Sequence, residues 1–328
     1  MEIDPTTTLG DVTQILERSP EIYPVLNVQD ARGMQLGVVS DCHIRFGFMW
    51  NLTKDDSIQK LIDLYEEIDA DARHVRLNDL NNAVKDNVAK GTLDPGGSGK
   101  LKYSALIMAG GFGTRLGHLT AETPKPLIDI AGRPLIAYSA NLLEQVSFEK
   151  LYISVFHLAD EFHKLTKNSE FPWEFEVLRE SEPLGTAGAL GLIEDNMTDN
   201  LYVLNADVVS SLQLCKMRIF HDLMGNDITV GVVRHQTTVP FGVTRYRGFG
   251  EFEQIEEKPQ YQSMISAGIN IVSRKSSKLI AKGEAIDMPD FLRKAREAEH
   301  RVSVFPIYED WRDVGTLQSL DEFRAQEN

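Results

Sequence analysis

Residues 104–134 read SALIMAGGFGTRLGHLTAETPKPLIDIAGRP, and this stretch decides the fold. Its apolar start, Ala105–Ala109, predicts a buried strand that runs directly into Gly110, Gly111 and Gly113. Glycines after a strand let the backbone approach a ligand closely and turn its N–H groups inward, which makes a concave site for anions. The stretch therefore predicts an anion-binding loop at the end of a strand.

Positively charged side chains follow these glycines. Thr114 and Arg115 continue the loop, and Lys125 and Arg133 stand in turns marked by proline. Two or three cations beside a glycine-rich loop favour a polyphosphate as the ligand. An ordinary strand-to-helix turn would explain the glycines alone, but it would leave the cations unexplained.

The loop differs from the two common phosphate-binding loops. A Walker loop requires GxxxxGK[ST], and no Lys-Thr or Lys-Ser pair follows Gly110; the dinucleotide fingerprint GxGxxG requires a third glycine where Leu116 stands. A dehydrogenase on a dinucleotide fold is therefore disfavoured. The stretch instead resembles the signature of the sugar-1-phosphate nucleotidyltransferases, LAGGxGTRLxPLTxxxPKPLxxVxGxP, with His118 in place of the usual proline.

Length and composition limit the other possibilities. The 328 residues, 42% hydrophobic and 25% charged, suit a globular protein with two domains. A net charge of −15 argues against nucleic-acid binding through a broad basic face. An acidic protein that handles nucleotides must concentrate its few cations locally, and we expect it to recruit a divalent metal. No apolar run approaches the roughly 18–20 residues of a membrane span and no leader-like segment opens the chain, so we expect a cytoplasmic protein. Cys42 and Cys215 are too few and too isolated for a disulfide framework.

The first 95 residues form a separate predicted domain. A helix is expected over Gly10–Arg18, followed by two short strands, Pro24–Val28 and Leu36–Ser40, with a DARG turn between them. This order resembles one cystathionine-β-synthase (CBS) motif. Such motifs usually work in pairs that bind adenosine nucleotides. Ile58–Glu67 predicts a further helix, but no second motif is readable, and His43 stands where ribose-binding motifs usually carry aspartate. We therefore expect a packing or oligomerisation role, with His43 at the surface or facing a partner.

A Gly/Ser-rich run predicts the boundary between the two domains. The sequence DPGGSGKLK ends at Lys102, and its composition is typical of a flexible joint. We place the linker at residues 96–102 and the second domain at residues 103–328.

The second domain alternates predicted strands and helices. Strands are expected at Ala105–Ala109, Leu151–Phe156, Glu174–Leu178, Leu201–Asn205 and Asp227–Val233, with short strands around Val243 and at Glu251–Glu256. Helices are expected at Ile136–Gln145, Asp160–Lys167, Thr186–Ile193, Lys216–Met224 and Leu317–Arg324. This order predicts an α/β fold, a Rossmann-like, mostly parallel mixed sheet with helices on both faces, whose ligands bind at the carboxyl ends of the strands.

Four later motifs are each compatible with an ordinary structural role. Glu182–Gly188, EPLGTAG, could be a loop and helix start, although its free N–H groups suit a base or a phosphate. Asp207 ends an apolar strand and Asp313 precedes a helix, as turn-forming aspartates often do. Charge runs such as Glu256–Lys258 usually belong to a solvated face. Together the two aspartates fit a Mg²⁺ ion, which prefers one or two carboxylates plus substrate phosphates.

The family resemblance, which covers about residues 104–320, assigns roles to these positions. It implies nucleotide binding by Ala109, Gly110, Gly111, Gly113, Thr114, Glu182, Gly185, Thr186 and Ala187. It implies catalytic roles for Arg115, Lys125, Asp207 and Lys258, and a Mg²⁺ site at Asp207 and Asp313. It implies contacts to the sugar phosphate from Gly242, Glu257, Lys258 and Ser266, where SAGIN replaces the usual NAGIY.

The resemblance implies an enzyme that joins a nucleoside triphosphate to a sugar 1-phosphate and releases pyrophosphate. EPLGTAGAL looks most like the guanylyl-transferring members, which favours GTP over UTP, dTTP or CTP. A CBS-like region before such a domain also resembles the glucosamine-1-phosphate guanylyltransferases of legionaminic acid synthesis, which implies GDP-glucosamine as product, a role in bacterial surface glycans and a homo-oligomer. The other possibility is a non-catalytic nucleotide-sugar sensor. Neither nucleic acid nor membrane is an expected partner.

Overall fold

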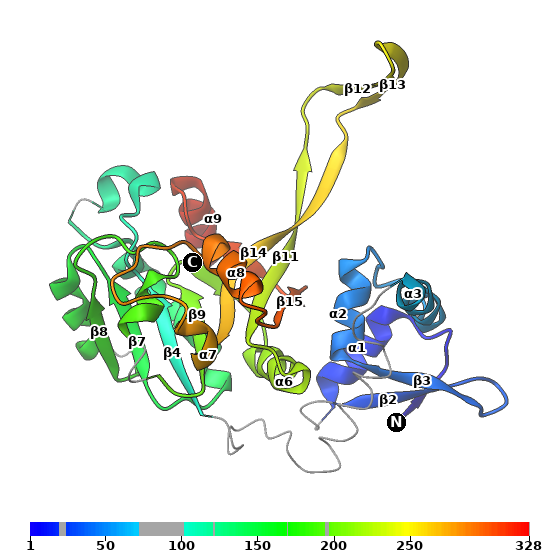
Figure 1. Cartoon of the computed structure of the whole chain (residues 1–328), viewed down its shortest axis with the longest axis horizontal. Helices are drawn as coiled ribbons and strands as arrows, with labels where there is room; N and C mark the ends of the chain where they lie inside the picture. Colours follow the sequence, from blue (N-terminus) through cyan, green and yellow to red (C-terminus); the bar gives the residue numbers. More distant parts are fainter. Residues whose placement is uncertain (20–23, 72–101, 121, 169, 194–196, 328) are drawn as a thin grey trace.

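The computed structural model describes residues 1–19, 24–71, 102–120, 122–168, 170–193 and 197–327 (Figure 1). The predicted linker lies outside the described residues except for Lys102. Within these ranges, no helix is both long and apolar enough to cross a membrane.

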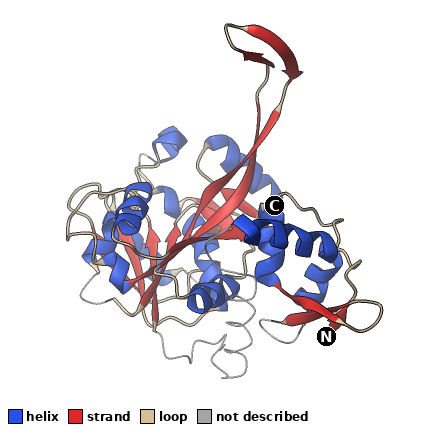
Figure 2. Ribbon diagram, turned by 45° about the vertical axis from the view of Figure 1, so that its right-hand side comes forward, coloured by secondary structure: helices blue, strands red, loops and turns tan. Residues whose placement is uncertain are grey.

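A seven-stranded mixed sheet forms the centre of the C-terminal part, with helices on both faces (Figure 2). Four of its neighbouring pairs are parallel, and only β14 runs antiparallel to its two neighbours. The strands, in their order across the sheet, are β15 (Val302–Ile307), β11 (Ile228–Thr238), β14 (Gln260–Ser273), β9 (Asn200–Asn205), β4 (Tyr103–Met108), β7 (Leu151–Val155) and β8 (Phe175–Arg179). The prediction of a mostly parallel α/β fold is confirmed.

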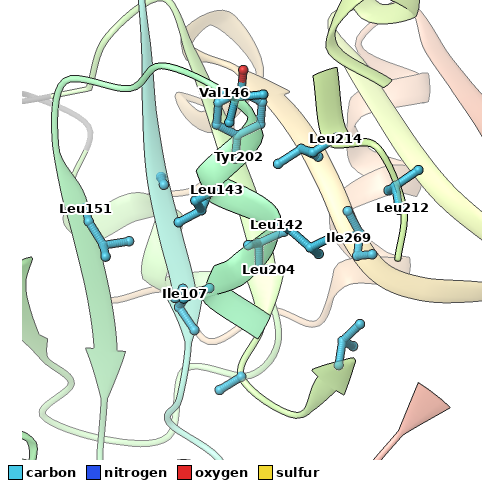
Figure 3. Packing of buried hydrophobic residues seen from close by; sticks show 14 of the residues in the cluster. Ile107, Leu142, Leu143, Val146, Leu151, Tyr202, Leu204, Leu212, Leu214 and Ile269 are labelled. Atoms are coloured by element: carbon cyan, nitrogen blue, oxygen red, sulfur yellow. The ribbon is translucent and has the colours of Figure 1, made fainter. Parts of the chain in front are cut away.

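The central strands are apolar along their whole length because both faces are covered. In β4, Ile107 points to one hydrophobic core while Leu106 points to the other, and in β9 Leu204 and Val203 divide in the same way. Figure 3 shows the first core, where Leu142 packs beside Ile107 and Leu204. This alternation fixes the face that each side chain occupies, and the parallel pairing of β4 with β9, up to Met108 opposite Asn205, places the ends of the two strands side by side.

Helices and 3₁₀ turns connect these strands. They are η1 (Thr114–Thr120), η2 (Lys125–Leu127), α5 (Leu135–Ala140), η3 (Asn141–Gln145), η4 (Ala159–Lys167), η5 (Gly188–Leu192), α6 (Leu214–Met224), α7 (Arg274–Ser277), α8 (Met288–Glu297) and α9 (Leu317–Glu327). Short two-stranded ladders are β5 (Asp129–Ile130) with β6 (Arg133–Pro134), β10 (Val208–Ser210) with β16 (Trp311–Asp313), and β12 (Gly242–Arg247) with β13 (Glu251–Glu257).

The expected helix over Thr186–Ile193 is wrong: the chain there forms only the 3₁₀ turn η5. Two glycines of this segment lie directly against the backbone of residues 281–284. A Cβ atom on Gly188 would lie 2.4 Å from the Glu284 carbonyl oxygen, and one on Gly191 would lie 2.7 Å from that of Ala281. Close packing against another segment therefore decides the conformation here, and helical spacing alone does not reveal it.

The strand expected at Asp227–Val233 is longer than predicted. β11 continues to Thr238 and pairs with β14 as far as Gln260, so the two strands leave the sheet as a ribbon that ends in the β12–β13 hairpin (Figures 1 and 2). We call residues 234–264 the arm. Its strands carry polar residues in the ribbon, RHQTT in β11, and this is why apolar patterning did not predict their length.

The N-terminal part has its own sheet and its own core. β1 (Glu2–Ile3), β2 (Val25–Gln29) and β3 (Gln35–Ser40) form a three-stranded sheet, which packs with α1 (Leu9–Arg18), α2 (Asp41–Met49) and α3 (Ile58–Asp71). Leu9, Val12 and Leu16 of α1 meet Ile44 and Ile58 in this core. The helix and strands predicted between residues 10 and 67 are present.

A cluster of charges joins the N-terminal part to the C-terminal part. The guanidinium of Arg45, fully buried, donates to both carboxylate oxygens of Glu309 at 2.9 and 2.7 Å and to the Pro306 carbonyl at 3.1 Å. Asp41 accepts from Arg45 at 2.5 Å and from the Lys216 ammonium at 3.0 Å. Burial alone would raise the pKa of Asp41, but the two cations outweigh it and lower that pKa.

The expectation that His43 lies at the surface is wrong, since its side chain is buried. Its Nδ1 atom accepts from the Ser40 N–H at 3.0 Å and so caps α2, and its ring packs edge-on against Tyr65. Within the described part of the chain its Nε2 atom has no hydrogen-bond partner. Burial lowers the pKa of His43 to about 4.

This buried histidine predicts a loss of stability in mild acid. The unfolded chain binds a proton near pH 6.5, whereas folded His43 resists it down to about pH 4, so stability falls as pH falls between these values. At pH 5 the loss from His43 is on the order of 2 kcal/mol. Urea unfolding at pH 7.5 and pH 5 measures this loss of stability. The variant His43→Asn can still accept from the Ser40 N–H but does not titrate, so its free energy of unfolding should fall less between the two pH values. His235→Asn, an exposed position, is the matched control, and an equal pH dependence in all three proteins would contradict the prediction.

Candidate active site

A cleft of about 370 Å³ opens at the carboxyl ends of β4 and β9, where an α/β sheet is expected to bind its ligand. Three segments supply most of its walls: the glycine-rich loop after β4, the loop after β8 and the end of β9. The lining residues include Ala109, Gly110, Gly111, Gly113, Thr114, Arg115, Lys125, Glu180, Gly185, Thr186, Asn205, Asp207 and Gly315.

The loop after β4 is rich in glycine because its backbone passes other groups at very short range. A Cβ atom on Gly110 would lie 2.5 Å from the Glu180 carboxylate. Gly113 has a φ of +64°, and a Cβ there would approach Thr120 and Lys125 within 3.0 Å. At Gly111 no heavy atom lies within 4 Å of the Cβ position among the described residues, so this glycine faces open space in the cleft. The loop thus presents backbone, not side chains, to a ligand.

Lys125 and Asp207 form an ion pair on the floor of the cleft. The Lys125 side chain is only 9% exposed, and its ammonium donates to the Asp207 carboxylate. η2 holds Lys125 in position, and Asp207 stands between β9 of the central sheet and β10, which pairs with β16. A buried cation on a polar wall is well placed to receive a phosphate oxygen.

Asp313 lies beside this pair. β16 runs antiparallel to β10 with Asp313 opposite Val208, and the Val314 N–H donates to the Asp207 carbonyl at 2.9 Å. Partial burial raises the pKa of Asp313, and the neighbouring charge of Asp207 raises it further. Two carboxylates this close together are a suitable oxygen donor set for a divalent cation. No cluster of three or more His, Cys, Asp or Glu occurs among the described residues, so substrate oxygens would have to complete the coordination.

The loop Leu184–Gly188 is held in place by the start of α8. Both the N–H and the hydroxyl of Thr186 donate to Asp287, at 2.9 and 3.2 Å, and the Met288 N–H donates back to the Thr186 hydroxyl at 2.8 Å. Gly185 has a φ of +74°, and a Cβ there would lie 2.7 Å from the Asp287 carboxylate. This bonding leaves Thr186 at the cleft wall as a fixed surface.

Two of the expected nucleotide-binding residues do not line the cleft. Glu182 is exposed, and Ala187 is fully buried beneath the loop, where its N–H donates to the Ile286 carbonyl at 3.0 Å. The expected sugar-phosphate residues do not line it either. Gly242, Glu257 and Lys258 lie on the arm, and Ser266 lies on β14 near the base of the arm.

Glu180 is a site residue that sequence reasoning missed. It follows β8, is 8% exposed, accepts from the Leu184 N–H at 3.0 Å and accepts from the Ser154 hydroxyl. Because it also lies against Gly110, one carboxylate supports both loops of the cleft. The only available signal was a carboxylate just after a predicted strand, and carboxylates at such positions are common.

Replacement of Glu180 should weaken ligand binding in the cleft. Glu180→Ala leaves the Leu184 N–H without its acceptor and leaves a void beneath Gly110, so we expect KM for the ligand bound there to rise about 10-fold, the equivalent of a lost hydrogen bond. Glu180→Gln can still accept from Leu184 and donate to Ser154, and it should stay within about threefold of the original protein. Steady-state kinetics measures both variants; an unchanged KM in Glu180→Ala would show that the carboxylate does not support the site.

A family model described as nucleotidyl transferase matches residues 104–328. The chain belongs to the nucleotidyl transferase family. The chain is 31% identical over 221 residues to mannose-1-phosphate guanylyltransferase 1 from Arabidopsis thaliana, and 30% identical over 220 residues to the catalytic subunit beta of mannose-1-phosphate guanylyltransferase from Xenopus tropicalis. Each match takes in 64% of this chain and 61% of the relative. The chain thus spans about three-fifths of the length of these curated relatives.

Solved structures support the fold of the transferase. The crystal structure of HddC from Yersinia pseudotuberculosis has a TM-score of 0.53 and 23% sequence identity, and the match covers 69% of this chain and all of HddC. HddC complexed with GMP-PN has a TM-score of 0.54. The part of the transferase that matches HddC is about the size of the C-terminal part alone.

Proposed function

We propose that this protein transfers a guanylyl group from GTP to a sugar 1-phosphate, with a GDP-sugar and pyrophosphate as products. The observation that carries the proposal is the convergence of the glycine-rich loop, Arg115, Lys125 and Asp207 in one cleft, with Asp313 beside Asp207. These groups suit a reaction in which the substrate supplies the nucleophile and the protein's main task is to hold and neutralise phosphates.

The chemistry follows from this arrangement. An oxygen of the sugar phosphate attacks the α-phosphorus of GTP and forms the new P–O bond, while the bond from the α-phosphorus to the bridging oxygen breaks and pyrophosphate leaves with that electron pair. The N–H groups of the glycine-rich loop and the Arg115 guanidinium hold the triphosphate. Lys125 donates to the α-phosphate, where negative charge is concentrated in the transition state.

The residues present fit a divalent ion. Asp207 and Asp313 supply two neighbouring carboxylates, and Lys125 can leave Asp207 for a phosphate oxygen when substrate binds. A bound Mg²⁺ would supply charge neutralisation at the phosphates and orient them.

Guanine as the base is supported by the names of the relatives and by the sequence of the second cleft loop. Both curated relatives are guanylyltransferases by name, and the HddC complex contains GMP-PN. The loop around Gly185 and Thr186 is rigidly held by Asp287, and it offers backbone groups at a fixed distance to a flat base. Mannose 1-phosphate, from the relatives' names, and glucosamine 1-phosphate, from the CBS-like resemblance, are the two acceptors to test first. We further propose that residues 1–95 and 103–328 are separate domains.

A substrate grid tests the proposal. Purified protein with Mg²⁺ is mixed with GTP, ATP, UTP, dTTP or CTP and with mannose, glucosamine or glucose 1-phosphate, and pyrophosphate release is measured. We expect GTP with one of the first two acceptors to give the highest kcat/KM. A preference for another base by tenfold or more would overturn the guanylyl assignment. Absence of pyrophosphate from every pair would overturn the enzymatic assignment and favour a sensor of nucleotide sugars.

A further inference from the structure

The arm carries charged side chains, Glu257 and Lys258, that do not line the cleft of its own chain. Gly242 and Glu257 face each other across the β12–β13 ladder, and a Cβ on Gly242 would lie 3.0 Å from a Glu257 carboxylate oxygen. Lys258 follows with a φ of +48°, an uncommon conformation for a lysine. It is exposed, and it forms no ion pair with any residue that the structure describes. The end of the hairpin that joins the ribbon thus carries an exposed cation without an ion-pair partner among the described residues.

The ribbon formed by β11 and β14 holds Lys258 away from the body of the protein. From Arg234 to Thr238, β11 pairs residue by residue with β14, and the only register shift between the two strands lies deeper, between Val230 and Val232. These five pairs alone extend the ribbon by roughly 15 Å beyond the sheet. Folding the arm back onto its own cleft would require the continuous ladder to break, so Lys258 is poised to act elsewhere.

Exposed apolar side chains gather on the same arm. Among the described residues, thirteen large hydrophobic side chains are conspicuously exposed, and seven of them lie between residues 241 and 264. They are Phe241, Tyr246, Phe249, Phe252, Ile255, Tyr261 and Met264. A two-stranded ribbon is marginally stable by itself, and a concentration of exposed aromatic residues marks a protein interface. The arm therefore requires a protein surface to cover it.

The proposed reaction identifies that surface. The cleft lining supplies Arg115 and Lys125 for the triphosphate, but no residue of the arm, and the second phosphate of the reaction is left without a cation of its own. We propose that the arm of one chain docks on a second copy of the same chain and places its Lys258 beside the sugar phosphate in that copy's cleft. This inference rests on the proposed function and goes beyond it.

Exchange of two identical arms closes a twofold-symmetric dimer. In such a dimer each arm covers the other copy, the apolar residues of both arms become buried, and each active site is built from two chains. Lys258 would act as a point charge on the sugar phosphate, and Glu257 would accept hydrogen bonds from sugar hydroxyls.

A complementation experiment tests the contribution in trans. Lys125→Met removes the cation of the cleft and Lys258→Met removes that of the arm, and we expect each variant alone to lose nearly all pyrophosphate release. Co-expression of the two variants with different tags assembles mixed dimers in which one of the two sites has both lysines. Purified mixed dimers should recover about half of the original activity, as one intact site in two requires. No recovery, while the original protein is active, would show that each arm serves its own chain and overturn the proposal. Normal activity in Lys258→Met would overturn it as well.

The particle mass gives a second readout that does not depend on activity. Sedimentation should find twice the 36.8 kDa of one chain, and the double variant Phe249→Asp/Phe252→Asp should sediment as a monomer. Met34→Asp, at an exposed apolar position of the N-terminal part, is the control and should remain a dimer. A monomeric original protein at assay concentration, or a dimer that survives the arm substitutions, would overturn the proposal. If the substrate grid yields no pyrophosphate, the proposed function fails, and sedimentation still decides whether the arm joins two copies.

Discussion

Lys125→Met should slow pyrophosphate release by a factor of about 10² to 10³ and leave the fold unchanged, since one preorganised donor at a transition-state charge is typically worth that much. The side chain is 9% exposed and its ammonium lies within hydrogen-bonding distance of Asp207, at the floor of the cleft. Methionine keeps the apolar stem and removes only the charge. Asp207 itself is 24% exposed, so water can solvate its carboxylate in the variant.

The matched control for Lys125→Met is Lys164→Met. Lys164 pairs with Glu161 on the surface of η4, with 73% of its side chain exposed, and its loss should not change the rate. Circular dichroism and urea unfolding check that both variants are folded. Activity of Lys125→Met within tenfold of the original would show that this lysine does not contact the reacting phosphate.

Arg45→Met should destabilise the protein by about 3–5 kcal/mol, the usual cost of leaving buried carboxylates without their cation. The guanidinium is fully buried, donates to Asp41 and Glu309, and stacks 4.5 Å from the Phe305 ring and 4.4 Å from the Tyr308 ring. Methionine fills part of the volume but cannot satisfy either carboxylate. Chemical unfolding followed by tryptophan fluorescence measures the change.

Two further variants test whether the loss of stability in Arg45→Met comes from the buried cluster or would follow the loss of any ion pair. Arg247→Met removes an arginine that pairs with Glu251 on the exposed arm, 67% exposed, and it should cost less than about 1 kcal/mol. Arg45→Met/Glu309→Gln removes the unpaired charge at Glu309 and should recover part of the lost stability. Equal destabilisation in Arg45→Met and Arg247→Met would contradict a special role for the buried cluster.

Much of the cleft could be predicted from the sequence because its residues follow strands closely. The glycines after β4 and Asp207 after β9 are within a few residues of a strong apolar run, and the sheet topology brings both to one edge. Lys125 could be singled out as a cation in a proline-marked turn and Asp313 as an aspartate before a helix, but only the family resemblance assigned them catalytic and metal-binding roles.

The remaining features depend on contacts between distant segments, which spacing does not reveal. Glu180 acquires its place only when β8 and the glycine-rich loop come together. His43 was interpreted as a surface residue because its neighbours gave no sign of the Tyr65 ring that covers it. The two strands of the arm's hairpin were predicted, around Val243 and at Glu251–Glu256. The ribbon that carries the hairpin could not be predicted, because its β11 segment is polar and a ribbon in water lacks the apolar alternation of a half-buried strand.

The cluster around Arg45 has a consequence for how this sequence can change in evolution. Its members come from three distant regions of the chain, and each pairs with an opposite charge from the set Asp41, Arg45, Lys216 and Glu309. The two cations and two carboxylates balance, so replacing any one of them with a neutral residue leaves a net charge in the cluster, whereas a coordinated replacement does not. Among related chains that keep both parts, these four positions should therefore vary together, and a chain that loses the first 71 residues should have lost the charges at positions 216 and 309 as well.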